Sequence, residues 1–175
     1  MRQQRISNVA KILMVAVVVF ALFWTVEYTL RIIHHVGYSD WTQWRAVEES
    51  VVITPGMRAL VALFYVPVFV VALASFCYAM RLLQFYRAGI IFDHGPAVAL
   101  IGVGLSMVGV AVVDTYVYAF EETLLSAWNS DGPVSPRYYY DPGDITIALA
   151  GVGFCLIGWI TREGVRMREE NEGFV

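Results

Sequence analysis

Residues 97–119 read AVALIGVGLSMVGVAVVDTYVYA and carry a single charged side chain, Asp114. An α-helix of this length crosses the ~30 Å hydrocarbon core of a bilayer at ~1.5 Å per residue. Three further apolar blocks occupy residues 12–33, 60–82 and 145–160. The last of these reaches the length of a span once Asp144 and Thr161 are counted as its interfacial ends. A backbone in lipid must satisfy its own hydrogen bonds, so each block is predicted to be a helix.

The composition indicates a single membrane domain and leaves no room for a separate soluble domain. The 175 residues are 58% hydrophobic and 15% charged, and the loops between the blocks are too short to build a core of their own. We therefore predict an all-α, integral membrane, antiparallel four-helix bundle over residues 1–175, with helices at about 12–34, 57–82, 97–122 and 144–168. The net charge of −3, with no basic stripe, excludes direct nucleic-acid binding.

The distribution of basic residues predicts the orientation. Eight lie on the side of the two termini and the central loop: Arg2, Arg5, Lys11, Arg81, Arg87, Arg162, Arg166 and Arg168. Four lie on the other side: Arg31, Arg45, Arg58 and Arg137. Because basic loops stay in the cytoplasm, both termini are expected there. The first block is too long for a signal-peptide core and no A-x-A-like site follows it, so it is interpreted as a retained helix.

Two sets of small residues follow the 3–4 spacing of a helix face. One set lies in the third block and the other in the fourth: Gly102, Ser106 and Gly109, and Ala148, Gly151, Cys155 and Gly158. Small side chains let backbones approach closely in a membrane, so the third and fourth helices are predicted to pack through these two stripes. Gly102 and Gly104 are interpreted as packing residues rather than as part of a phosphate loop.

Local signals mark the ends and one kink. Pro67 lies inside the second block and should kink that helix, because proline removes a backbone hydrogen bond. Gly89 is expected to cap the same helix at its C-terminus, and Asp93 or His94 to begin the next one. The charged tail, residues 162–172, should extend the last helix, with Glu163 paired to Arg166.

The candidate polar site lies in the outer half of the first and third helices. Its members share one face of each helix: Glu27, Arg31 and His34 on the first, and Asp114, Tyr118 and Glu121 on the third. Ionisable groups at this depth are costly and tend to pair inside a bundle. Carboxylates with histidines are also the donors of a divalent metal site or of a proton or cation route.

A structural interpretation of this cluster is preferred. Glu27 and Arg31 form a favourable i, i+4 ion pair, and a location at the water surface is the alternative for the adjacent Glu121 and Glu122. On this interpretation the pairs only seal the outer end of the bundle. We predict no catalytic residue, no resident metal and no cofactor.

Two stretches also resemble a known family. The segments YRAGIIF, residues 86–92, and REGVRMREENE, residues 162–172, resemble the YoaS-like family of uncharacterised four-helix bacterial membrane proteins, a domain of unknown function. Members of that family end in Glu-Asn-Glu and a short apolar tail and are often encoded beside a small helix-turn-helix regulator. The resemblance implies a multi-pass protein of the bacterial cytoplasmic (inner) membrane in a regulatory or accessory setting.

These observations lead to one expected function and two alternatives. The first is a non-enzymatic accessory or regulatory protein that lies in the lipid bilayer and contacts a membrane-protein partner or further copies of itself. The second is a small oligomeric transporter or ion-conducting protein that uses an outer-leaflet cluster of Glu27 and Asp114. An enzyme acting on lipid is the third.

Overall fold

The computed structural model describes residues 2–37, 54–129 and 141–172, and all of the regular structure in these ranges is helical. The helices are α1 (Arg2–Gly37), α2 (Pro55–Phe64), α3 (Val66–Arg87), α4 (His94–Asn129) and α5 (Pro142–Glu172). In the described part of the chain, four helical stretches are long and apolar enough to cross a membrane: Gln4–Leu30, Pro55–Arg87, His94–Glu121 and Pro142–Glu172. The prediction of an all-helical chain with four membrane-length helices is confirmed.

The observed helices are longer than the ranges expected from hydropathy. Each expected range lies inside a helix or, for residues 57–82, inside the α2–α3 pair. Hydropathy identifies only the part of a helix that is apolar enough to lie in lipid. The backbone hydrogen bonds of the helix continue into the polar residues at both of its ends. The tail illustrates this, since α5 continues to Glu172. Arg166 pairs there with Glu163 as expected, and also with Glu170 at 3.5 Å.

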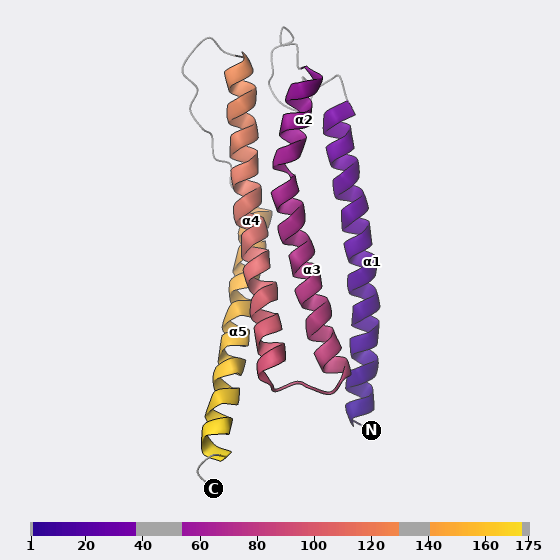
Figure 1. The fold of residues 1–175 in the computed structure, drawn as a ribbon, viewed down its shortest axis with the longest axis vertical. Coiled ribbons are helices and arrows are strands. Elements are labelled where there is room, and N and C mark those ends of the chain that lie inside the picture. Colours follow the sequence, from indigo (N-terminus) through magenta and orange to yellow (C-terminus); the bar gives the residue numbers. More distant parts are fainter. Residues whose placement is uncertain (1, 38–53, 130–140, 173–175) are drawn as a thin grey trace.

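The helices pack in series. In the part of the chain that the structure describes, α3 packs against α1 and α4, and α5 packs against α4. Helix α2 extends the line of α3 and touches both α1 and α4 (Figure 1). Both chain ends lie at the same end of the molecule (Figure 1). In the most apolar stretch of α4, 39% of residues are buried, against 6% in α1 and 11% in α5, so α4 is the central helix.

Proline interrupts the second span where the sequence predicts a kink. α2 ends at Phe64 and α3 begins at Val66, with Tyr65 at the junction and Pro67 in the first turn of α3. Pro67 has no N–H to donate to the preceding turn. Hydrogen bonding resumes when the Phe69 N–H donates to the Tyr65 carbonyl over 3.1 Å. The break therefore sets the position of Tyr65.

The turn between α3 and α4 also follows its sequence signal. Gly89 has a φ of 80°, a conformation that costs glycine little. Its N–H donates to the Tyr86 carbonyl over 3.1 Å, and the Ile90 N–H donates to the Phe85 carbonyl over 2.9 Å. This pair of bonds is a Schellman cap, so the prediction of a Gly89 cap is confirmed.

The prediction that two small-residue stripes pack on each other is correct for the stripe on α5. The α5 stripe does face α4: a Cβ placed on Gly151 would lie 2.7 Å from the Gly104 carbonyl oxygen. Further along, a Cβ on Gly158 would lie 3.0 Å from the Ala97 carbonyl oxygen. The Cys155 thiol also donates to the Ile101 carbonyl of α4 over 3.7 Å.

The α4 half of that prediction is wrong. Gly102, Ser106 and Gly109 face α3 instead: a Cβ on Gly102 would meet the Tyr78 ring, and the Ser75 hydroxyl donates to the Ser106 hydroxyl over 2.7 Å. The face toward α5 carries Gly104. Because α4 lies between two neighbours, it needs a small-residue face for each. The glycines at 102 and 104 therefore serve different contacts.

Candidate functional site

Glu121 of α4 is the most deeply buried polar side chain among the described residues, with 0% of its surface exposed. The Tyr65 hydroxyl donates a hydrogen bond to Glu121 Oε2 over 2.6 Å. The alternative that places Glu121 at the water surface is therefore wrong. α4 runs on for two more turns, to Asn129, and the kinked α2–α3 junction covers this side of it.

Tyr65 is a site residue that the sequence reasoning missed. The break between α2 and α3 holds it, and Val61 one turn earlier is 1% exposed and packs against both Tyr65 and Trp128 of α4. The signal was present, because Tyr65 is two residues before Pro67, where the kink had to fall. The position of a proline alone, however, does not say which neighbour the freed side chain will reach.

Aromatic rings connect this hydrogen bond to α1. Tyr28 of α1 meets the Tyr65 ring edge-on with centroids 6.1 Å apart, and it stacks on Trp24 at 4.8 Å. Tyr28 and Trp24 also stack on Phe69 of α3, at 6.1 Å and 5.8 Å. Such ring pairs add to the free energy gained from burial alone. Packed aromatic rings thus link α1 to the α2–α3 span, and the hydrogen bond between Tyr65 and Glu121 links that span to α4.

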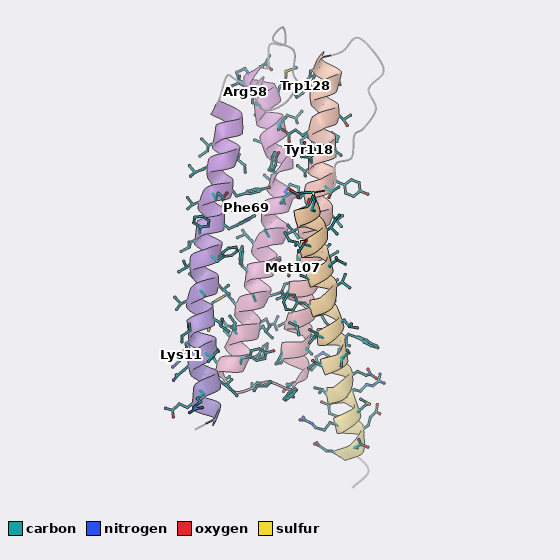
Figure 2. All side chains as sticks on the ribbon, turned by 180° about the vertical axis from the view of Figure 1, so that it is seen from behind. Lys11, Arg58, Phe69, Met107, Tyr118 and Trp128 are labelled. Carbon is teal, nitrogen blue, oxygen red and sulfur yellow. The ribbon has the colours of Figure 1, made fainter. Side chains whose placement is uncertain are left out.

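The other predicted site residues are distributed on two helices. Glu27 lies on α1, while Asp114 and Tyr118 lie on α4. All three are partly exposed and have interaction partners within the protein. The α2–α3 span runs between α1 and α4 (Figure 1), so Glu27 and Asp114 belong to the two helices that flank it. Figure 2 labels Tyr118 on α4, with Arg58 and Trp128 closer to the end of the molecule opposite the termini.

Two predicted members lie partly outside the described structure. Arg31 and His34 belong to α1 by their backbone, but their side chains are outside the described part. The Glu27–Arg31 pair therefore stays a prediction. Among the side chains that are described, no group of three or more His, Cys, Asp and Glu residues is arranged to hold a metal ion.

The hydrogen bond between Tyr65 and Glu121 acts as a clamp, and we call these two residues the Glu121 clamp. A hydrogen bond between a phenol and a carboxylate is short and roughly twice as strong as a neutral one when the carboxylate is ionised. Here it joins α2–α3 to α4 at the kink, where the backbone has lost a hydrogen bond of its own. The geometry favours a structural role for Glu121, with Tyr65 as the partner that holds it.

No family model matches the chain, and neither a curated protein nor a solved structure matches it.

Proposed function

We propose that this protein is a non-enzymatic accessory or regulatory membrane protein that acts by binding another membrane protein. The observation that carries the proposal is the exposure of α1. Five aliphatic residues at 3–4 spacing along it are each 57–69% exposed: Ile12, Val15, Val19, Leu22 and Val26. This spacing is that of a helix–helix seam. We call these five residues the α1 seam.

The other helices leave α1 accessible for such a contact. α1 packs on α3 and α2 from one side only, while α4 fills the centre of the protein and has neighbours on two sides. In lipid, helices associate through packing rather than through the hydrophobic effect. A regular row of aliphatic side chains is a surface along which a partner helix can pack. The resemblance of residues 86–92 and 162–172 to the YoaS-like family supports a regulatory setting for that contact.

The proposed membrane arrangement is an antiparallel four-helix bundle in the bacterial inner membrane, with both termini in the cytoplasm. Its support is the surplus of Lys and Arg beside the termini and the 81–96 loop. The location of both chain ends at one end of the molecule is consistent with it (Figure 1).

Reporter fusions test this orientation. A reporter enzyme that works only in the cytoplasm should be active when it is joined after Val175. A reporter enzyme that works only outside the cytoplasm should be active when it is inserted within residues 40–49. Adding two lysines within residues 40–49 is the matched control, because it should weaken the bias and produce mixed topology. An external C-terminus in the unaltered protein would contradict the orientation.

Purification from mild detergent tests the partner. The C-terminally tagged protein should retain a second membrane protein, and Val19→Trp together with Leu22→Trp should reduce its recovery about tenfold or more, because bulky rings disrupt the fit of the α1 seam. Leu149→Trp with Leu156→Trp on the exposed face of α5 is the matched control and should leave recovery unchanged. Equal recovery with both double variants would overturn the α1 seam as the binding surface.

A small oligomeric transporter or ion-conducting protein is the alternative. The observation that favours it is the presence of two carboxylates, Asp114 and Glu121, on one helix of the bundle, with Glu121 fully buried. Buried carboxylates in membrane proteins mark ion routes in many families. Four helices enclose little space, so such a route would run between protomers. Recovery of a homo-oligomer and no other protein in the purification above would favour this alternative.

A further inference from the structure

A hollow of about 420 Å³ lies between α4 and α5, beside the start of α5. Its walls come from both helices and include Ala111, Val112 and Tyr116 of α4, and Asp144, Ile145 and Ala148 of α5. The volume lies within the ~300–1,000 Å³ of small-molecule sites. The described residues that line it are distinct from the Glu121 clamp and from the α1 seam.

The offset between the two helices creates this hollow. α5 begins at Pro142, beside the middle of α4, while α4 continues to Asn129 (Figure 1). Nearer the chain termini the helices are in close contact at Gly104 and Gly151. At the hollow, the small side chains of Ala111 and Ala148 leave the space between the two backbones unfilled. The hollow is therefore the open end of an otherwise tight contact.

The walls are apolar except on one side, which is acidic. Asp144 contributes a carboxylate to the hollow, and no basic side chain lines it among the described residues. Asp141 lies one turn before Asp144 and adds a second negative charge close by. Asp141 Oδ1 accepts the Gly143 N–H over 2.8 Å, which caps the helix. The Thr115 hydroxyl on the opposite wall is turned to its own backbone, donating to the Ala111 carbonyl over 2.9 Å.

We propose that this hollow binds a primary ammonium group carried on an apolar body, such as the amine headgroup of a membrane lipid. Asp144 would accept hydrogen bonds from the ammonium, and Tyr116, 62% exposed, lines the same hollow. Val112 and Ile145 contact the adjoining methylenes. A divalent metal is a poor fit, because it requires about six oxygen ligands and these walls are mostly carbon.

A quaternary ammonium is also a poor fit. It has no N–H to donate to Asp144, and its recognition relies on a cage of several aromatic rings. Within the described structure, Tyr116 is the only aromatic residue of the lining. Phosphatidylethanolamine and phosphatidylcholine differ only in the three N-methyl groups of choline, which remove the N–H donors and enlarge the headgroup. Comparing the two lipids, together with Asp144→Asn, separates hydrogen-bonded recognition from general affinity for lipid.

Native mass spectrometry of the full-length protein tests the proposal. After release from bilayers of equal phosphatidylethanolamine and phosphatidylcholine, the protein should retain the ethanolamine lipid about tenfold more than the choline lipid. Asp144→Asn, which keeps the side-chain size, should abolish the preference. Ala148→Leu, which fills the hollow and keeps Asp144, should lower retention of both lipids. Asp93→Asn, an exposed acidic residue just before the start of α4, is the matched control and should change nothing.

A second arm distinguishes the source of the amine. Dodecylamine added to phosphatidylcholine bilayers supplies the same ammonium without a phosphate. Binding of dodecylamine that Asp144→Asn removes, with no preference for the ethanolamine lipid, assigns the site to a free amphiphilic amine. The absence of both preferences, or preferences equal in wild type and Asp144→Asn, would overturn the proposal. The purification experiment on the α1 seam fails or succeeds independently of this result.

Discussion

Gly151→Leu is expected to lower the free energy of unfolding in detergent by about 3 kcal/mol or more. Its Cβ would lie 2.7 Å from the Gly104 carbonyl oxygen and 3.0 Å from Met107 Cβ and Val108 Cγ2 of α4. Two of these neighbours are backbone or Cβ atoms, which cannot rotate aside. The two helices must therefore separate along their contact. Reversible unfolding in mixed micelles, followed by circular dichroism, measures the loss.

Gly153→Leu is the matched control, two residues further along the same helix. Outside its own stretch of helix, a Cβ at Gly153 would meet no described atom within 4 Å. The substitution should be neutral or slightly stabilising, since leucine has a higher helix propensity than glycine. Gly102→Leu should also destabilise the fold, because its Cβ would lie against the Tyr78 ring, Cγ included, and the whole side chain of this 37% exposed residue must move to make room. Equal losses from Gly151→Leu and Gly153→Leu would mean that the close α4–α5 contact is not what stabilises the fold.

Tyr65→Phe is expected to cost about 1–3 kcal/mol of stability, because it removes the donor to a fully buried carboxyl oxygen and leaves the rest of the side chain in place. Glu121→Ala should cost more, about 2–5 kcal/mol, since it also leaves a cavity and removes the acceptor of the Tyr65 hydroxyl. Glu121→Gln keeps both the shape and an acceptor, so its effect should be the smallest of the three. The same unfolding measurement applies.

A double-mutant cycle separates the bond from the packing. Tyr65→Phe and Glu121→Ala each remove the hydrogen bond, so their effects, measured singly and together, should be non-additive by about 0.5–3 kcal/mol if the two groups act as one clamp. Tyr78→Phe is the control for loss of a tyrosine hydroxyl, because Tyr78 lies on the same span and is partly exposed. If the two substitutions have additive effects on the free energy of unfolding, the hydrogen bond between Tyr65 and Glu121 contributes nothing beyond the packing of the two side chains.

Features governed by local physics could be predicted before the structure was known. The transfer of apolar side chains from water to lipid determines where helices can span. The missing N–H of Pro67 determines where the second span breaks, and the steric freedom of glycine explains the cap at Gly89. Charges four residues apart or fewer explain the pairs in the tail. Each of these depends on a few neighbours along the chain.

The candidate site could be predicted only in part. Helical spacing correctly places Asp114, Tyr118 and Glu121 on the same helix, but burial of Glu121 depends on Tyr65, which is 56 positions away in sequence. Charge alone favours the water surface for two adjacent glutamates. The tertiary fold reverses that preference at Glu121, because Tyr65 supplies the hydrogen bond that makes burial tolerable.

By itself, then, the sequence determined the number of membrane-length helices, their kink and their caps, while the tertiary structure decided which face of each helix meets which neighbour. α4 shows the reason. Its membrane-length stretch is apolar apart from a few residues such as Asp114, so no division into polar and apolar faces distinguishes its sides. Its small residues form two faces two positions apart, at Gly102 and Gly104. Either face satisfies the rule for close packing. The choice between α3 and α5 follows from the positions of all the helices together, and so does the hollow where α5 begins beside the middle of α4.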